Sequence, residues 1–399
     1  NGAVAIKIKT DRSDTIKKNI VNFIKKYSSI NEGANPGLVF YQHEKIPEHF
    51  SEFGESALCQ LISRSKAKEF ALKNGLESFY LGNGQGLVGA IGAIGYSFDD
   101  HTFELISYRS ESNFGKKREI FKESVKKMQN LTYPRTFNSY DEEKNRVLIA
   151  PHGPDPVLCG IRGEDIDAVI SGASLVKTAE KIDGYMIFRS NQGTGAHLKN
   201  ELDIFNLKPF SSGIITGRVY DEPKIERGGH VIFSVTKNGH KIQCAVYKPT
   251  GMTQIASKLI KGDLIKVGGG IRKASKNHQR ILNIEFLEIL KLEKNLKMVN
   301  PLCHKCNKKM KSKGKKQGFE CIICGKTLQH KTLHEIPREI EKRLYVPVLS
   351  AHRHLTRPLQ RIGRFNKKTE FVDSKKWFYV SEPIRNQKPV IKTRIAVRH

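Results

Sequence analysis

Four cysteines with the spacing of metal ligands are the clearest chemical signal in this 399-residue sequence. They form two CxxC pairs separated by fourteen residues, namely Cys303 with Cys306 and Cys321 with Cys324. Two such pairs can close a tetrahedral site of four thiolates around Zn²⁺. The lysine-rich segment between them has too few apolar residues to fold without the metal. The sequence therefore predicts a structural zinc site, and His304 is an alternative ligand that the two pairs make unnecessary.

A polar stretch, Arg189 to Leu198, is the second set of residues that could do chemistry. It places Asn191, Gln192 and Thr194 around two glycines, and glycine lets a backbone approach a ligand closely. The stretch follows an apolar run, so we expect it to leave the end of a strand, where α/β folds bind ligands. An ordinary loop between domains has the same composition. Our candidates are Asn191 and Thr194 for catalysis, and Gln192 and Gly193 for cofactor binding.

A glycine-rich run, residues 82–86, precedes an apolar segment that predicts a tightly packed helix from Leu87 to Ile94. Glycine-rich loops that open a helix present N–H groups and a positive dipole end to phosphate. The spacing matches neither a P-loop nor the dinucleotide fingerprint, because no Gly-Lys-Ser/Thr follows and no clear strand precedes. A close-packed helix and a nucleotide site both remain open. The cofactor-binding candidates here are Gly82, Asn83, Gly84 and Gly86.

The segment 151–164 combines three prolines with ionisable side chains. The prolines leave a loop with less freedom to lose on binding, although its three glycines act in the opposite sense. A stiff loop with such side chains indicates a site more than a spacer. The catalytic candidates on it are His152, Asp155 and Arg162.

The formal net charge of +29, from 69 Lys and Arg against 40 Asp and Glu, points to a polyanionic partner. RNA, DNA and an anionic membrane surface all fit that charge. No run of ~20 apolar residues and no signal-peptide pattern is present, so we expect a cytoplasmic protein without a membrane partner. Protein partners are unknown. The RNA-binding candidates are Lys308, Lys311 and Lys315 between the cysteine pairs, and Arg353, His354 and Arg357 in the tail.

Hydrophobic periodicity predicts a multidomain α+β chain whose elements position these residues. The first part should contain strands at 3–9 and 37–41 and helices at 16–27, 57–72 and 87–94. The second part should follow the order βαββαβ of a ferredoxin-like domain, with strands at 102–108, 136–140, 146–150 and 185–188 and helices at 117–128 and 166–176. The first residue is Asn1 rather than Met, so we expect the chain to begin inside a domain.

Five short strands follow residue 198, at 213–219, 230–235, 241–247, 264–267 and 282–289. A helical segment near 253–260 lies between the third and fourth strands, which is the order of an OB-fold barrel. Any other small β-barrel is the alternative, and the net charge favours one that binds nucleic acid.

Taken together, these motifs resemble the archaeal tRNA 2-agmatinylcytidine synthetases, which act on the isoleucine tRNA with a CAU anticodon. The resemblance rests on Gly-Asn-Gly-Gln-Gly-Leu-Val-Gly-Ala from 82, Pro-His-Gly-Pro-Asp-Pro-Val-Leu from 151, Gly-Ile-Arg-Gly-Glu from 160 and Arg-Ser-Asn-Gln-Gly-Thr from 189. The barrel, the zinc ribbon and Arg-His-Leu-Thr-Arg-Pro from 353 then follow in the family's order.

The resemblance implies an ATP-dependent ligase that attaches agmatine to the C2 carbon of the wobble cytidine, with Mg²⁺ and Zn²⁺ as further cofactors. It implies five parts: the C-terminal part of a kinase-like catalytic domain at 1–97, the ferredoxin-like domain at 98–198, the OB-fold domain at 199–295, the zinc ribbon at 296–332 and a basic extension at 333–399. The partners would be agmatine and the isoleucine tRNA.

The sequence departs from the family pattern at two places. The family's Asp-Asp-Thr-Asp-Ser motif near the start, whose acids would be the magnesium ligands, is absent from this sequence, and Gly195 stands where the pattern has an acid. The alternative class is a non-catalytic RNA- or DNA-binding protein built from the same barrel and ribbon. Clustered His, Asp, Arg and Asn in two loops favour the enzyme, because a scaffold does not need them.

Overall fold

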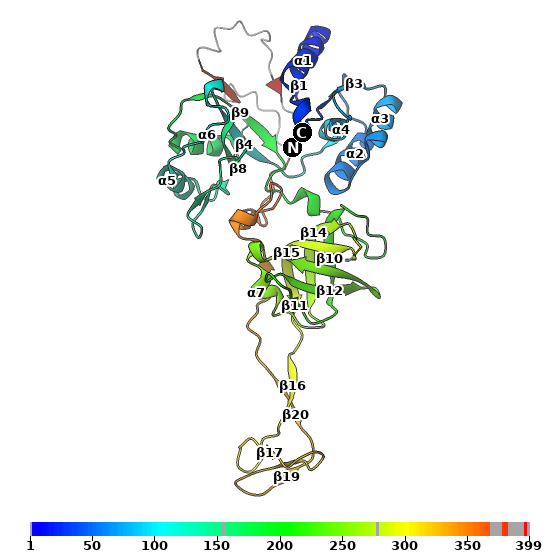
Figure 1. Cartoon of the computed structure of the whole chain (residues 1–399), viewed down its shortest axis with the longest axis vertical. Coiled ribbons are helices and arrows are strands. Elements are labelled where there is room, and N and C mark those ends of the chain that lie inside the picture. The colour runs from blue at the N-terminus through cyan, green and yellow to red at the C-terminus, as the bar shows by residue number, and fades with distance from the viewer. Residues whose placement is uncertain (1, 154–155, 277–278, 368–376, 382–394, 397–399) are drawn as a thin grey trace. The chain divides into compact units, whose positions relative to one another are not determined.

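The computed structural model of the chain describes residues 2–153, 156–276, 279–367, 377–381 and 395–396 (Figure 1). Its contacts divide the chain into two compact units, one of residues 1–214, 269–273 and 346–399 and the other of 215–268 and 274–345. The fold is mixed α+β, with a closed five-stranded barrel and a ribbon that carries four cysteines. Among the described helices, none is long and apolar enough to cross a membrane.

The first part of the chain is a small α/β layer in which glycines permit very close packing. Its elements are β1 (Lys7–Ile8), α1 (Ser13–Tyr27), β2 (Gly37–Phe40), α2 (Glu48–Cys59), α3 (Arg64–Lys73), β3 (Glu77–Tyr80) and α4 (Gly86–Gly95). Strands β2 and β3 pair antiparallel. A Cβ atom on Gly86 would lie 2.3 Å from the backbone nitrogen of Gly37, so α4 crosses β2 at a distance that only glycine allows.

Two predictions for this part are wrong in detail. The single helix expected at 57–72 is two helices, because the chain is extended at Gln60 and the Ser63 side chain caps α3 by accepting the N–H of Lys66 at 3.2 Å. A strand does precede the glycine-rich run, since β3 ends at Tyr80. The run therefore lies in a strand-to-helix connection.

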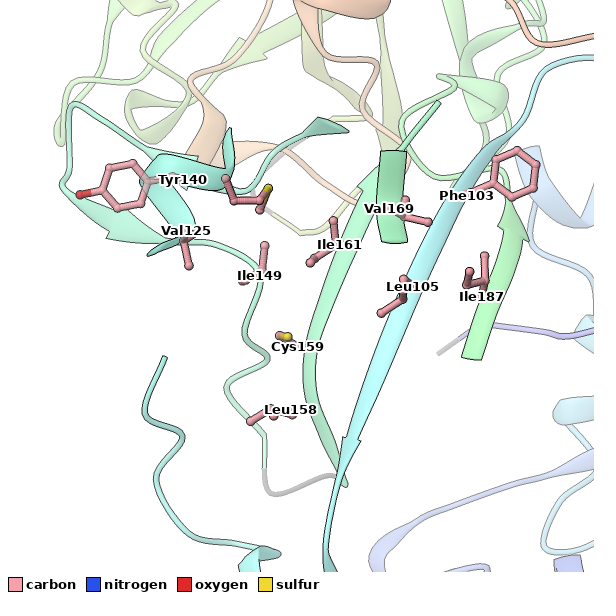
Figure 2. Close-up of a cluster of buried hydrophobic side chains, with 11 residues drawn as sticks. Phe103, Leu105, Val125, Tyr140, Ile149, Leu158, Cys159, Ile161, Val169 and Ile187 are labelled. Carbon is pink, nitrogen blue, oxygen red and sulfur yellow. The ribbon is translucent and has the colours of Figure 1, made fainter. Parts of the chain in front are cut away.

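A five-stranded antiparallel sheet follows, in the spatial order β22-β9-β4-β8-β5. Its strands are β4 (Thr102–Arg109), β5 (Thr136–Phe137), β8 (Val157–Gly163), β9 (Ile182–Ser190) and β22 (Phe378–Val380). Helices α5 (Lys122–Thr132) and α6 (Ile166–Leu175) pack against it and bury one apolar core. Val125 and Val169 of the helices and Leu105, Ile161 and Ile187 of the strands all belong to this core (Figure 2). Each of these buried aliphatic side chains contributes about 1.5–3 kcal/mol to folding.

The predicted order βαββαβ is present, but its third strand is not where the sequence placed it. Residues 146–150 contribute only β7 (Arg146–Val147), which forms a small hairpin with β6 (Tyr140–Asp141). The third strand is β8, and it contains the second half of the segment that we expected to be a loop. Arg162 therefore lies on a strand, opposite Glu104 of β4. The strand was not predicted because the segment contains several glycines, and glycine weakens the interior of a strand.

The barrel is formed by β10 (Ser212–Val219), β12 (Val231–Lys237), β13 (His240–Val246), β14 (Leu264–Arg272) and β15 (Ile281–Lys291). The strands follow the order β10-β14-β15-β13-β12, and the pairing of β10 with β12 closes the barrel. Helix α7 (Thr253–Ala256) lies between β13 and β14, as predicted. β11 (Lys224–Ile225) and β21 (Leu344–Tyr345) extend the sheet.

After β15 the chain leaves as a two-stranded stalk, β16 (Leu296–Val299) paired with β20 (Thr332–Glu335). The stalk carries the cysteine ribbon, whose strands are β17 (Lys311–Ser312), β18 (Phe319–Glu320) and β19 (Thr327–Leu328). Arg338 then returns the chain to the barrel, because its guanidinium bonds both oxygens of the fully buried Asp263 at 2.6 and 2.7 Å. The remaining elements are β23 (Ile395–Ala396), paired with β1, and the 3₁₀ turns at 30–32, 111–113, 196–198, 248–250, 349–351 and 359–361.

Candidate functional site

The polar stretch that leaves β9 forms a compact turn, here called the central loop (residues 191–198). Gly193 and Gly195 have φ of +69° and +67°, in the left-handed region that glycine adopts without strain. Thr194 is 3% exposed, and its hydroxyl donates to the carbonyl oxygen of Asn191 at 2.5 Å and accepts the N–H of Ala196 at 3.2 Å. The hydroxyl of Thr194 therefore shapes the loop from within.

Residues 353–366, here called the tail segment, lie directly on the central loop. The N–H of Gly193 donates to the carbonyl of His354 at 2.8 Å, and the N–H of Gly195 donates to that of Leu355 at 2.7 Å. Arg357 donates to the carbonyl of Thr194 through two of its nitrogens, at 2.9 and 2.6 Å. Residues far apart in the sequence thus meet in one structure.

Arg357 was expected among the RNA contacts, and its guanidinium is occupied inside the protein instead. Besides Thr194 it bonds the carboxylate of Asp100 at 2.7 Å and the carbonyls of Arg361 and Arg364. These contacts use every N–H donor of the guanidinium, which leaves none for a phosphate. Burial lowers the pKa of Arg357, and Asp100 acts in the opposite direction.

Arg361, four residues further along the tail, is 0% exposed. It bonds Asp100 at 3.0 Å, Glu164 at 2.7 Å and the carbonyl of Gly193 at 2.9 Å. These partners of Arg361 lie far upstream in the sequence, where composition alone cannot locate them.

A second polar cluster lies beside the loop, on strands β4 and β8. Arg162 bonds Glu104 at 3.0 Å and also donates to Nδ1 of His354 at 3.2 Å. Gln192 donates to the other oxygen of Glu104 at 2.5 Å. Burial, and then the charge of Arg162, lower the pKa of His354. The structure therefore brings together Arg162 and Gln192, both expected at the site, with Glu104, which the sequence did not single out.

The loop before β8 holds the other catalytic candidates. His152 is exposed and its Nε2 lies 2.6 Å from a guanidinium nitrogen of Arg146. Asp155 lies outside the described residues. Arg118 holds the base of the loop by donating to the carbonyls of Pro151, Gly153 and Val157 at 3.1, 2.8 and 2.7 Å.

The glycine-rich turn, residues 82–86, is held in place by the side chain of Asn35. Its side-chain oxygen accepts the N–H of Asn83 at 2.9 Å, and the Asn83 side chain in turn accepts the N–H of Gln85 at 2.8 Å. Gly82 and Gly84 flank Asn83 with positive φ, and Gly86 begins α4. The turn thus has the preorganised form of a loop that opens a helix.

The central loop and the glycine-rich turn lie at opposite ends of α4. The turn precedes Gly86, whereas Tyr96, which follows the last residue of α4, lies near Asn191. A helix of this length spans about 15 Å, which is the distance between the two ends of α4 next to these segments. Burial raises the pKa of Tyr96 to about 12, and the nearby Asn191 opposes that shift.

The four cysteines form the metal site that their spacing predicts. Their Sγ atoms all lie within 4.8 Å of one another, and those of Cys303 and Cys324 are 3.5 Å apart. Tetrahedral Zn²⁺ with Zn–S bonds near ~2.3 Å needs sulfur atoms about 3.8 Å apart, so the donors fit this ion. The backbone N–H groups of Cys306 and Lys305 lower the pKa of Cys303 to about 6, whereas the hydrogen bond with Cys324 and burial raise the pKa of Cys306 to about 12. His304 is exposed and stands outside this group.

Comparison with known proteins agrees with this architecture. Residues 84–197 match the model of the TiaS FLD domain, and residues 300–340 match that of the TiaS C-terminal zinc ribbon domain. The isoleucine-tRNA 2-agmatinylcytidine synthetase TiaS of Cenarchaeum symbiosum is 43% identical over 95% of this chain and 84% of that protein. The corresponding protein of Methanocaldococcus jannaschii is 38% identical over 91% of this chain and 86% of that protein.

Solved structures give the same result. The crystal structure of apo TiaS superposes with a TM-score of 0.78 at 32% identity, covering 88% of this chain and 83% of that one. The complex of TiaS with its isoleucine tRNA, AMPCPP and agmatine superposes with a TM-score of 0.78 at 31% identity and the same coverage. Sheet, barrel and cysteine ribbon together thus define a protein of the class that modifies tRNA. The chain belongs to the family of isoleucine-tRNA 2-agmatinylcytidine synthetases, which confirms the resemblance seen in its motifs.

Proposed function

We propose that this chain conjugates agmatine to the C2 carbon of the wobble cytidine of the isoleucine tRNA with a CAU anticodon, with consumption of ATP. The product, 2-agmatinylcytidine, would make the anticodon read AUA rather than AUG. The observation that carries the proposal is 43% identity over 95% of the chain to a protein of that name. The superposition on a relative in complex with the isoleucine tRNA, AMPCPP and agmatine supports it.

The chemistry requires two bond changes at C2. Transfer of a phosphoryl group from ATP to the C2 oxygen turns a poor leaving group into a good one. The amine of agmatine then forms a bond to C2, and the phosphorylated oxygen leaves as phosphate. Positioned donors around the phosphoryl group offset the charge that moves during transfer.

We assign the reactant contacts to the two polar segments of the sheet domain. Asn191 lies on the central loop near Tyr96. Arg162 bonds Glu104, which also accepts from Gln192 of the loop. Thr194 acts by shaping the loop, since its hydroxyl is used within it. The other candidates are His152 and Asp155 for catalysis and Gly82, Asn83, Gly84, Gly86, Gln192 and Gly193 for the nucleotide.

Zinc and magnesium would have different places in this protein. Cys303, Cys306, Cys321 and Cys324 would hold Zn²⁺, which would fold the ribbon and take no part in the reaction. Mg²⁺ would accompany the phosphates of ATP. Among the described residues, the cysteines are the only group of three or more His, Cys, Asp or Glu side chains close enough to share an ion. We therefore assign no residue to Mg²⁺.

We also propose a finer division of the chain than the two compact units. It has a kinase-like segment at 1–97, a ferredoxin-like domain at 98–198, an OB-fold domain at 199–295, the zinc ribbon at 296–332 and a basic extension at 333–399. The strand order β9-β4-β8-β5 and the closed barrel support the second and third assignments. The lysines of the ribbon, with Arg353 and His354, would contact tRNA phosphates, and the protein would work in the cytoplasm.

ATP consumption by the full-length protein tests the proposal against a protein that only binds RNA. ATP should be consumed at a substantial rate only when agmatine and the isoleucine tRNA are both present. Asn191→Ala should lower the rate by about 10-fold or more, the scale of a lost positioning contact, with unchanged tRNA affinity. Tight tRNA binding without agmatine-dependent ATP consumption would favour the binding protein instead.

A further inference from the structure

The tail segment 353–366 and the central loop form one bonded assembly. Two left-handed glycines of the loop, Gly193 and Gly195, donate their N–H groups to carbonyls of the tail. Arg357 and Arg361 return bonds to the loop carbonyls of Thr194 and Gly193. A turn with two glycines has much backbone entropy to lose, so these contacts restrict a segment that would otherwise sample many conformations.

Both arginines meet the same buried carboxylate. Asp100 is 3% exposed, and its two oxygens accept from Arg357 at 2.7 Å and from Arg361 at 3.0 Å. Asp100 also accepts the backbone N–H of Asn366 at 2.9 Å. The carboxylate therefore joins the start of β4 to three residues of the tail.

Glu164, which directly follows β8, is the second carboxylate that binds the tail segment. It accepts from Arg361 at 2.7 Å and from the Asn366 side chain at 3.0 Å. Asn366 donates further to the carbonyl of His101 at 3.0 Å. Each nitrogen of the buried Arg361 guanidinium thereby has an acceptor, as a cation away from water requires.

We propose that Asp100, Glu164, Arg357 and Arg361 are positioning residues that hold the central loop in the conformation the reaction needs. The inference rests on the proposed function, because it assumes that Asn191 contacts a reactant. A buried ion pair often stabilises a fold no more than apolar side chains of the same volume would, but it can specify one conformation. Here it specifies the conformation of a glycine-containing loop next to residues proposed to act on the substrate.

The chain offers a matched control at the opposite end of the same strand. Arg109 ends β4 and bonds both oxygens of Glu180, at 3.0 and 2.6 Å. The side chains of Arg109 and Glu180 are 2% and 13% exposed, against 0% and 13% for Arg361 and Glu164. The length of β4 separates Arg109 from the loop end of the strand at Thr102, which is roughly 23 Å.

The test compares Arg361→Met with Arg109→Met in the full-length protein, using steady-state kinetics of agmatine transfer to the isoleucine tRNA. We expect Arg361→Met to lower kcat by about 10- to 100-fold, the effect of a misplaced reacting group, and to leave KM for tRNA unchanged. Hydrogen exchange should show lost protection at the amides of Gly193 and Gly195 alone. Arg109→Met should keep both the kcat and that protection.

A milder variant, Asn366→Ala, keeps the test valid if Arg361→Met does not fold. It removes side-chain bonds to Glu164 and to the carbonyl of His101 but leaves the ion pairs intact. A smaller loss of kcat with faster exchange at Gly193 supports the inference. Wild-type kcat in this variant and in folded Arg361→Met, or an equal loss in Arg109→Met, overturns it. An inactive wild-type protein would contradict the proposed function, whereas the exchange data would still report on the assembly itself.

Discussion

Neutralising three lysines of the ribbon should weaken tRNA binding in a salt-dependent way. Lys308, Lys311 and Lys315 are exposed, and within the described residues none of them forms an ion pair. Lys313, between them, is paired with Glu320 at 3.0 Å and is left unchanged. The three ammonium groups are therefore available to phosphates.

The expected magnitude follows from counterion release. Each phosphate contact contributes about 0.7–0.9 to the slope of log Kobs against log salt concentration, so three Lys→Gln changes lower the slope by about 2–3. Between about 50 and about 200 mM salt, the wild-type protein should then lose roughly 20- to 40-fold more affinity than the triple variant. Fluorescence anisotropy with labelled isoleucine tRNA over a salt series measures both slopes.

A charge-matched variant separates local contacts from general electrostatics. Lys18, Lys25 and Lys26 lie on α1, and their change to glutamine removes the same net charge. This control should keep the wild-type slope. Two results would refute a specific role for the ribbon lysines: a wild-type salt slope in the ribbon variant, or a salt slope in the control that falls as much as that of the ribbon variant.

Three further predictions concern the folded framework. Protein purified without added metal should hold about one zinc ion per chain, and Cys306→Ser should lose it; a folded ribbon free of zinc in metal analysis would contradict this. Arg338→Met leaves the buried Asp263 without its cation and should lower the free energy of unfolding in urea by about 3–5 kcal/mol. The exposed Arg218→Met should cost at most about 1 kcal/mol, and equal effects would argue against a buried clamp. Gly86→Ala should destabilise by about 1–3 kcal/mol or more, because its Cβ would overlap backbone, and an unchanged melting temperature would count against that packing.

Local signals in the sequence were enough to predict the barrel and the zinc site. Each barrel strand is a short apolar run bounded by turn residues, and each CxxC pair is a local pattern with one chemical solution. Strand β8 was not predicted because Gly160 and Gly163 lower the strand propensity of its sequence. In the sheet, the Gly160 position faces the side chain of Glu104 on β4. Strand propensity is a weak guide when neighbouring strands decide what fits.

The candidate site was predicted only in part, because its organisation depends on long-range charge pairs. Asn191 and Thr194 do lie on a loop at a strand end, as expected. That Arg361 is buried against Asp100 follows from contacts across 261 positions, which periodicity and composition do not encode. The two adjacent acidic residues just before a strand, Asp99 and Asp100, were a local signal that could have indicated a partner for these arginines.

Nucleoside analysis of the anticodon tests the central claim most directly. The full-length protein would be incubated with the isoleucine tRNA, ATP and isotope-labelled agmatine, and the tRNA would be digested for mass spectrometry. We predict one labelled nucleoside, cytidine joined to agmatine at C2, at the wobble position, and none when ATP is omitted or when the wobble cytidine is replaced by uridine. Label found at another position, label that appears without ATP, or unmodified cytidine after prolonged reaction would contradict the account.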